Sequence, residues 1–385
     1  MKASRTNTLG MRPGAVRFLL PGGFLGAGKT TATARLARMF QDQGSRVGII
    51  TNDQADDLVD TVTLEGQGFA VEQVAGACFC CHFDALTRSA AALKARSQPE
   101  VILAEPVGSC TDLVATVIRP LMKLYGDNFT LVPYGVLLKP EYARQILDEN
   151  AGTLQSDAAY IFRKQLEEAD YIAVNKVDAL AESQVDRLVE LARKANPGAP
   201  VVPISARTGQ GFARLMELID GPGQVAGRIL DLDYDRYARG EAELGWLNCR
   251  IKVISVPLSF SLDDLLEEIA STLAAALGAG SAEIAHLKIS GRSGTYLGLV
   301  NLVDRRRSSE LSIPSGGEVH DAVLTINARV VMDPAVLEEQ VVGTVEEVCL
   351  RRGLRPEIQA LRSFRPGRPV PVHRFVSVGD VIASG

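Results

Sequence analysis

The chain has 385 residues, of which 46% are hydrophobic, and a formal net charge of −5 at pH 7. This length favours two domains, and the negative charge gives no general attraction to nucleic acid or to an anionic membrane surface. No stretch approaches the roughly 18 uninterrupted apolar residues of a membrane-spanning helix. The amino terminus also lacks the apolar run and cleavage site of a secretory signal, so we expect a cytoplasmic protein with reduced thiols and with neither a nucleic-acid nor a membrane partner.

Apolar segments bounded by turn residues recur in the first part of the chain, with helical segments between them. They read as strands at 15–22, 46–53, 99–106, 130–138, 169–178 and 199–206. Strands that alternate with helices indicate a mainly parallel sheet covered by helices on both faces. We therefore predict an α/β domain over residues 1–220.

A Gly/Pro-rich break begins at Asp220, and residues 221–245 read as a linker. The pattern that follows is β-α-β-β-β-α with a possible last strand, and its helices are expected at 260–278 and 333–349. This order predicts a smaller α+β domain of ferredoxin-like type over 246–375. The segment from Arg351 to Phe375 has seven arginines and one glutamate. We interpret its end as a solvated basic tail that extends to residue 385, with docking to an acidic partner as the alternative.

The segment GGFLGAGKT matches a phosphate-binding loop, because it has the spacing Gly-x4-Gly-Lys-Thr and stands between a predicted strand and a predicted helix. Backbone N–H groups of such a loop hold the β-phosphate, Lys29 reaches the β- and γ-phosphate oxygens, and the Thr30 hydroxyl binds Mg²⁺. The predicted nucleotide-binding residues of the loop are Gly23, Gly26, Ala27, Gly28, Lys29, Thr30 and Thr31.

Two further segments indicate that the base is guanine. NKVD contains Asn175, Lys176 and Asp178, and SART contains Ser205 and Ala206; each segment follows an apolar strand. An aspartate placed as Asp178 accepts hydrogen bonds from N1 and the 2-amino group of guanine, and adenine lacks that amino donor. We therefore predict GTP and GDP as the ligands.

The segment EPVG at the end of a predicted strand supplies the remaining groups that a GTPase needs. Glu105 can hold Mg²⁺ through a bound water, and the N–H of Gly108 can meet the γ-phosphate. The loop TNDQADD offers Asp53, Asp56 and Asp57 as switch carboxylates, although a solvated acidic loop is the alternative. We predict Lys29, Asp53 and Glu105 as the catalytic residues.

Three of the six cysteines, Cys78, Cys80 and Cys81, lie within the short stretch GACFCC. Thiolates at this spacing on a tight loop can converge on one late transition metal and leave a fourth position open, which His82 or a switch carboxylate can fill. A redox-active Cys-x-x-Cys pair and inert buried cysteines are the alternatives. Cys110 is a candidate extra ligand, whereas Cys249 and Cys349 stand in apolar segments and are assigned to packing.

Together, GGFLGAGKTT, GACFCC, EPVG and NKVD resemble the CobW-like branch of the P-loop GTPase family that also includes UreG and HypB. The resemblance covers residues 22 to about 205 and implies a GTP-switched metallochaperone, with the three clustered cysteines binding a transition metal. Zn²⁺ is favoured, and Co²⁺ and Ni²⁺ remain open. The partner is then a client metalloprotein or cofactor enzyme, and a nucleotide-dependent homodimer is plausible for the class.

This sequence departs from the family pattern at Leu138-Lys139-Pro140, where relatives commonly carry a Val-Asp-Ala-like stretch, and it has no histidine-rich tract. Its carboxy-terminal half is only loosely similar to the usual domain. We therefore keep two alternatives to the metallochaperone: a GTP-dependent regulatory module for a corrinoid or other cofactor enzyme, and a redox-sensing GTPase.

Overall fold

The computed structural model of the chain describes residues 15–52, 59–148, 156–221, 225, 227–279, 284–302 and 310–376. The predicted switch carboxylates Asp53, Asp56 and Asp57 lie outside the described residues. The chain divides into two compact units. Unit 1 comprises residues 1–54, 69–240 and 368–385, and unit 2 comprises residues 55–68 and 241–367.

These units differ from the predicted domains in three places. The predicted linker contains the helix α9 (Tyr234–Ala242), within which unit 1 ends. Residues 55–68 belong to unit 2, although the prediction placed them in the first domain. The segment from residue 368, predicted as a solvated tail, belongs to unit 1, and its Phe375 is buried. Packing between segments that are distant in sequence determines these boundaries, and local periodicity does not report such packing.

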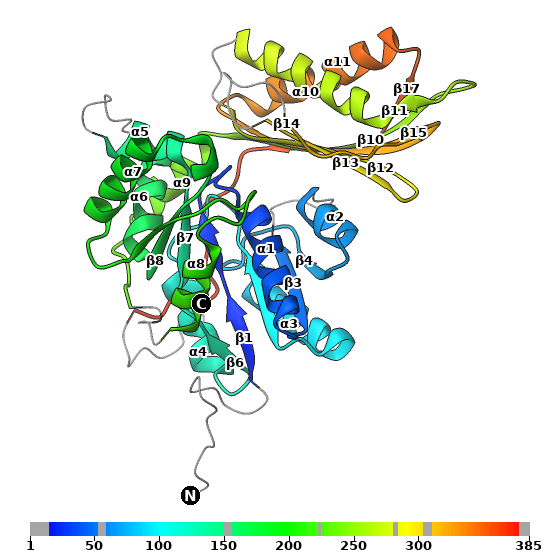
Figure 1. The fold of residues 1–385 in the computed structure, drawn as a ribbon. Coiled ribbons are helices and arrows are strands. Elements are labelled where there is room, and N and C mark those ends of the chain that lie inside the picture. Colours follow the sequence, from blue (N-terminus) through cyan, green and yellow to red (C-terminus); the bar gives the residue numbers. More distant parts are fainter. Residues whose placement is uncertain are drawn as a thin grey trace, which may run out of the picture. The chain divides into compact units, whose positions relative to one another are not determined.

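Unit 1 has the predicted α/β fold, with parallel strands and helices on both sides (Figure 1). One group of strands has the order β4-β3-β5-β1-β6 and the other β2-β7-β8-β9, and the strand pairs are parallel. All residues of β3 and β5 are buried, as expected for strands covered on both faces. The strands are β1 (Val16–Leu19), β2 (Pro21–Gly23), β3 (Val47–Asn52), β4 (Ala70–Val74), β5 (Val101–Glu105), β6 (Phe129–Leu131), β7 (Gly135–Leu138), β8 (Tyr171–Val174) and β9 (Val201–Pro203).

The helices of unit 1 follow most of these strands, as the βα alternation predicts. They are α1 (Lys29–Asp42), α3 (Phe83–Ser97), a π-helical turn η1 (Val114–Ile118), α4 (Arg119–Tyr125), α5 (Pro140–Leu147), α6 (Asp157–Glu168), a 3₁₀ turn η3 (Val177–Ala179), α7 (Glu182–Ala195) and α8 (Phe212–Asp220), with α9 at the end. Because the strands are parallel, their carboxyl ends and the loops that follow them share one edge.

Unit 2 is an antiparallel sheet of order β14-β13-β12-β16-β10-β17 with helices α10 and α11 on one face (Figure 1). Its elements are β10 (Gly245–Ile254), β11 (Phe260–Ser261), α10 (Leu262–Ala279), β12 (Ile284–Ser293), β13 (Tyr296–Leu302), β14 (Glu310–Ile313), β15 (Glu318–Val319), β16 (Asp321–Val330), α11 (Pro334–Arg351) and β17 (Arg355–Phe364). Without β13 and β14, the order β12-β16-β10-β17 is that of a ferredoxin-like β-α-β-β-α-β unit. The predicted α+β fold is confirmed.

The helix α2 (Val59–Gly66) belongs to unit 2 and lies against β12, β13 and β16. Asn327 accepts a hydrogen bond from the N–H of Val59 at 3.1 Å, and Lys288 forms an ion pair with Asp60. Neighbours of these strand residues, such as Ile289 and Ile326, point into the core under α10 and α11. Since side chains alternate along a strand, α2 covers the opposite face. Among the residues that the structure describes, no helix is long and apolar enough to cross a membrane.

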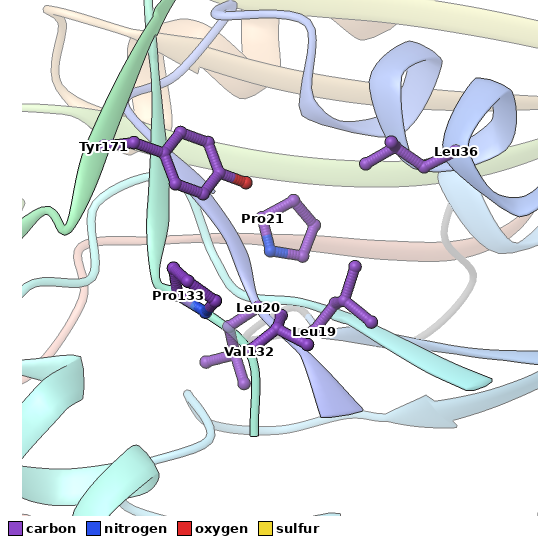
Figure 2. Close-up of a pocket in the computed structure, with 7 residues that line it drawn as sticks. All are labelled: Leu19, Leu20, Pro21, Leu36, Val132, Pro133 and Tyr171. Atoms are coloured by element: carbon purple, nitrogen blue, oxygen red, sulfur yellow. The ribbon is translucent and has the colours of Figure 1, made fainter. Parts of the chain in front are cut away.

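A small cavity in unit 1 lies where β1 meets β2 (Figure 2). The labelled residues around it are Leu19, Leu20, Pro21, Leu36, Val132, Pro133 and Tyr171. Its volume of about 10 Å³ is enough for a single water at most, and its lining is mainly apolar. The cavity is therefore a packing defect, and the chemistry of the chain lies elsewhere in unit 1.

Candidate nucleotide and thiol site

The predicted phosphate-binding loop connects β2 to α1, as the motif requires. Its glycines Gly23, Gly26 and Gly28 have φ angles of 134°, 72° and 88°, a backbone region that L side chains rarely adopt. Gly28 also has no room for a side chain, because a Cβ there would lie 2.5 Å from Nδ2 of Asn175. The helix α1 then begins at Lys29, so its first N–H groups and its positive dipole end face the loop, an arrangement that binds phosphate.

Thr30, Glu105 and Gly108 lie together beside this loop. The Thr30 hydroxyl donates a hydrogen bond to Oε1 of Glu105 at 2.9 Å, and Glu105 is buried at the end of β5. Mg²⁺ prefers oxygen ligands at about 2.1 Å and usually keeps several bound waters. The Thr30 hydroxyl is placed to bind such an ion directly, and the Glu105 carboxylate beside it is placed to hold one of the ion's waters. A Cβ on Gly108 would lie 3.0 Å from Nζ of Lys29, so the glycine backbone closely approaches the lysine that the motif assigns to the phosphates.

Asn175 joins the phosphate-binding loop to both segments of the predicted base pocket. Its Nδ2 donates to the carbonyl of Ala27 at 2.7 Å, and its Oδ1 accepts hydrogen bonds from the N–H groups of Lys176 and Ala206 at 2.8 and 2.9 Å. Asn175 is fully buried. Lys176 has a positive φ of 65°, which turns the chain toward Asp178. The spacing of these residues in the sequence groups them, but it does not indicate that one amide side chain holds them together.

Asp178 belongs to the same predicted base pocket, where its side chain is a charged hydrogen-bond acceptor. Ser205 donates to its Oδ1 at 2.7 Å, and Arg207 forms an ion pair with its Oδ2. Partial burial acts to raise the pKa of Asp178, but the hydrogen bonds from Ser205 and Arg207 outweigh it and lower the pKa below its usual value. An ionised carboxylate can accept two N–H donors from one edge of a base.

The three clustered cysteines lie on the loop between β4 and α3, and their sulfur atoms all lie within 4.8 Å of one another. The Sγ of Cys78 is 2.9 Å from that of Cys80 and 3.3 Å from that of Cys81, and the last two are 3.7 Å apart. Tetrahedral zinc with bonds of about 2.3 Å requires sulfur atoms about 3.8 Å apart. Small side-chain adjustments therefore allow all three thiolates to bind one ion.

The thiols around Cys78 lower the pKa of its own thiol. Hydrogen bonds from the thiols of Cys110, Cys80 and Cys81 hold the pKa of Cys78 well below its ordinary value, against the effect of burial. Cys110 therefore contacts Cys78. Among the described residues, however, the side chains close enough to hold one metal ion are those of the three loop cysteines, and neither Cys110 nor His82 is among them. The hydrogen bond with Cys78 raises the pKa of Cys81 to about 12. Cys249 and Cys349 are buried in unit 2.

Two residues connect the thiol loop to the ends of β3 and β5. Asn52 at the end of β3 donates to the carbonyls of Val74 and Ala77 at 2.9 and 2.8 Å and accepts a hydrogen bond from the N–H of Phe79 at 2.9 Å. Cys110, five residues after Glu105, contacts Cys78. The thiol loop is therefore attached to the end of β3 and to the segment after β5, which contains Gly108 beside the phosphate-binding loop.

Lys139, at the position where the sequence departs from the family pattern, is buried at the end of β7. Its Nζ lies 4.5 Å from the ring centroid of Tyr142, and the Tyr142 ring packs edge-on against Phe24 of the phosphate-binding loop. The lysine therefore supports the packing behind this loop, a position that the sequence did not indicate.

Comparisons with known proteins identify chains that are similar to this one. The family described as the CobW/HypB/UreG nucleotide-binding domain matches residues 18–203. The urease accessory protein UreG of Metallosphaera sedula is 25% identical over 213 residues, which are 51% of this chain and 90% of that protein.

Solved structures with detectable likeness include HypB from Helicobacter pylori in complex with nickel, at 19% identity, a TM-score of 0.37, and coverage of 52% of this chain and 84% of that one. They also include the Zn(II)-bound YjiA GTPase from E. coli, at 16% identity, a TM-score of 0.38, and coverage of 86% of this chain and 99% of that one.

Proposed function

We propose that this chain, which belongs to the CobW/HypB/UreG family of GTPases, is a metallochaperone that uses Mg²⁺-dependent GTP binding and hydrolysis to control a transition metal held by Cys78, Cys80 and Cys81. The observation that carries the proposal is the attachment of the thiol loop, through Cys110, to the segment after β5 that contains Gly108, and through Asn52 to the end of β3. A movement of the segment that contains Gly108 with the γ-phosphate would change the geometry of the thiols.

The chain's own residues account for the nucleotide chemistry by position and charge. The amides of residues 23–31 and the ammonium of Lys29 stabilise phosphate oxygens, while Asn175 holds this loop against the base pocket. Asp178 selects guanine. Thr30 and Glu105 would hold Mg²⁺, which neutralises phosphate charge when it is bound. Asp53, on the segment after β3, is proposed to position the attacking water or to link the nucleotide to the thiols.

The three thiolates suit a late transition metal, with Zn²⁺ favoured over Co²⁺ and Ni²⁺, and leave a coordination position for transfer. The recipient is proposed to be a client metalloprotein or cofactor enzyme that the cytoplasmic chain meets as a monomer or as a nucleotide-dependent dimer. Because thiolates must lose protons to bind, metal uptake should weaken as the pH falls.

Metal binding to anaerobically purified protein tests this function. We expect one Zn²⁺ per chain in the wild type, and at least about a tenfold loss of affinity in each of the Cys80→Ala and Cys81→Ala variants, because two thiolates bind zinc less tightly than three. Cys349→Ala is the matched control, since this cysteine is buried in unit 2.

Absence of stoichiometric metal in the wild type would contradict the metallochaperone function. If the protein then formed a disulfide between loop cysteines under mild oxidation, a redox-sensing GTPase would become the favoured function. If it formed no disulfide, a GTP-dependent regulatory module would be the remaining candidate function.

A further inference from the structure

The last described residues of the chain, 368–376, lie across the thiol loop of unit 1; we call this segment the strap. Its side chains alternate between two sides: Pro369 and Phe375 are buried, whereas Val370, Val372 and Val376 are exposed. Prolines at 369 and 371 favour an extended backbone at the residues before them and have no N–H group. The backbone donors at 369–372 are therefore those of residues 370 and 372. The strap is thus an extended segment with donors at alternate positions.

Both of these donors bind the thiol loop. The N–H of Val370 donates to Sγ of Cys81 at 3.3 Å, and the N–H of Val372 donates to the carbonyl of Cys80 at 2.9 Å. The imidazole of His373 packs edge-on against the ring of Phe83, two residues after Cys81, with ring centroids 5.0 Å apart. Cys78 and Cys80 are 3% and 1% exposed, and Cys81, whose sulfur accepts the hydrogen bond from the strap, is half-buried.

The other end of the strap is anchored to the segment that follows Gly108. Arg374 donates to Oδ2 of Asp112 at 2.7 Å and to the carbonyl of Leu230 at 2.8 Å. Tyr234 donates to the same Asp112 oxygen at 2.8 Å, and the Asp112 side chain is 1% exposed. The N–H of Phe375 completes the anchor by donating to the carbonyl of Ala115 at 2.9 Å.

We propose that the strap is an intramolecular cover that controls access to Cys80 and Cys81 and is fastened by the Arg374–Asp112 ion pair. Asp112 lies four residues after Gly108, the residue whose backbone approaches Lys29. A movement of this segment with the nucleotide would therefore loosen the anchor and open the thiols. The role of the strap in metal exchange rests on the proposed function, whereas its covering of the thiols does not.

Alkylation of the metal-free, full-length protein by iodoacetamide tests the cover, with the rate at each cysteine followed by mass spectrometry. Arg374→Ala removes the ion pair, and Val370→Pro removes the N–H that binds Cys81. We expect each variant to raise the alkylation rate of Cys81 by about tenfold or more, as for a local opening that becomes easier. Arg355→Ala is the matched control, because this exposed arginine lies on β17 in unit 2 and forms an ion pair with the nearby Glu357.

In the same samples, the buried Cys249 and Cys349 report on unfolding of unit 2, and the GDP affinity of each variant reports on the fold of unit 1. An unchanged Cys81 rate in both strap variants would overturn the proposal. If the variants unfold by either measure, hydrogen exchange of the wild type decides: the amides of residues 370, 372 and 375 should be protected, and rapid exchange at all three would overturn the cover. Failure of the wild type to bind metal would contradict the proposed function alone and leave the alkylation result standing.

Discussion

Lys29→Ala should reduce GTP turnover by about 10²- to 10³-fold or more, because it removes the cation that stabilises negative charge on the phosphoryl group during its transfer. Lys29 is the first residue of α1 and directly follows the left-handed Gly28, so the loop backbone is retained in the variant. Phosphate release under saturating GTP measures turnover, and calorimetry with GDP separates this loss from a loss of binding.

The matched control is Lys94→Ala, which removes an exposed lysine in the last turn of α3 in the same unit. We expect its turnover to equal that of the wild type. A Lys29→Ala variant that binds GDP and retains wild-type turnover would show that the loop between β2 and α1 is not where hydrolysis takes place.

Asp178→Asn should weaken GTP affinity by about 10²-fold or more, because an amide donor would then face the donors on the guanine edge. The variant should gain affinity for xanthosine triphosphate, since xanthine carries a carbonyl oxygen where guanine carries the 2-amino group. Ser205 still can donate to the remaining carbonyl oxygen of the side chain, so the pocket should stay folded. Competition binding with both nucleotides measures the switch.

Asp186→Asn changes an exposed aspartate on α7 in the same way and is expected to leave both affinities unchanged. Equal GTP affinity in Asp178→Asn and the wild type would remove the assignment of the base pocket to this residue.

The fold was predictable where local pattern determines it. Fully apolar segments such as 101–104 become buried parallel strands, and the Asp333-Pro334 start of α11 is an N-terminal signal that the structure retains, with Asp333 accepting from the N–H of Ala335 at 2.9 Å. Glycine spacing likewise located the turn between β2 and α1, because positive φ angles demand glycine there.

Contacts between distant segments were not predictable in this way. Asn175 contacts Ala27 across 148 positions, and Arg374 contacts Asp112 across 262. Nothing in local periodicity indicates that an arginine in a Pro/Arg-rich segment has a buried carboxylate as its partner, so the basic composition suggested a solvated tail. The membership of α2 in unit 2 similarly depends on Lys288 and Asn327, more than two hundred residues away.

In the proposed function, the nucleotide changes the metal affinity of the three clustered cysteines. The most direct test of this coupling is a Zn²⁺ titration of the wild type against a competing chelator, in the presence of Mg²⁺ and either GDP or a non-hydrolysable GTP analogue. We predict a difference of about 1–3 kcal/mol, or roughly 5- to 150-fold in affinity, between the two nucleotide states. Identical affinities in both states, with both nucleotides demonstrably bound, would contradict it.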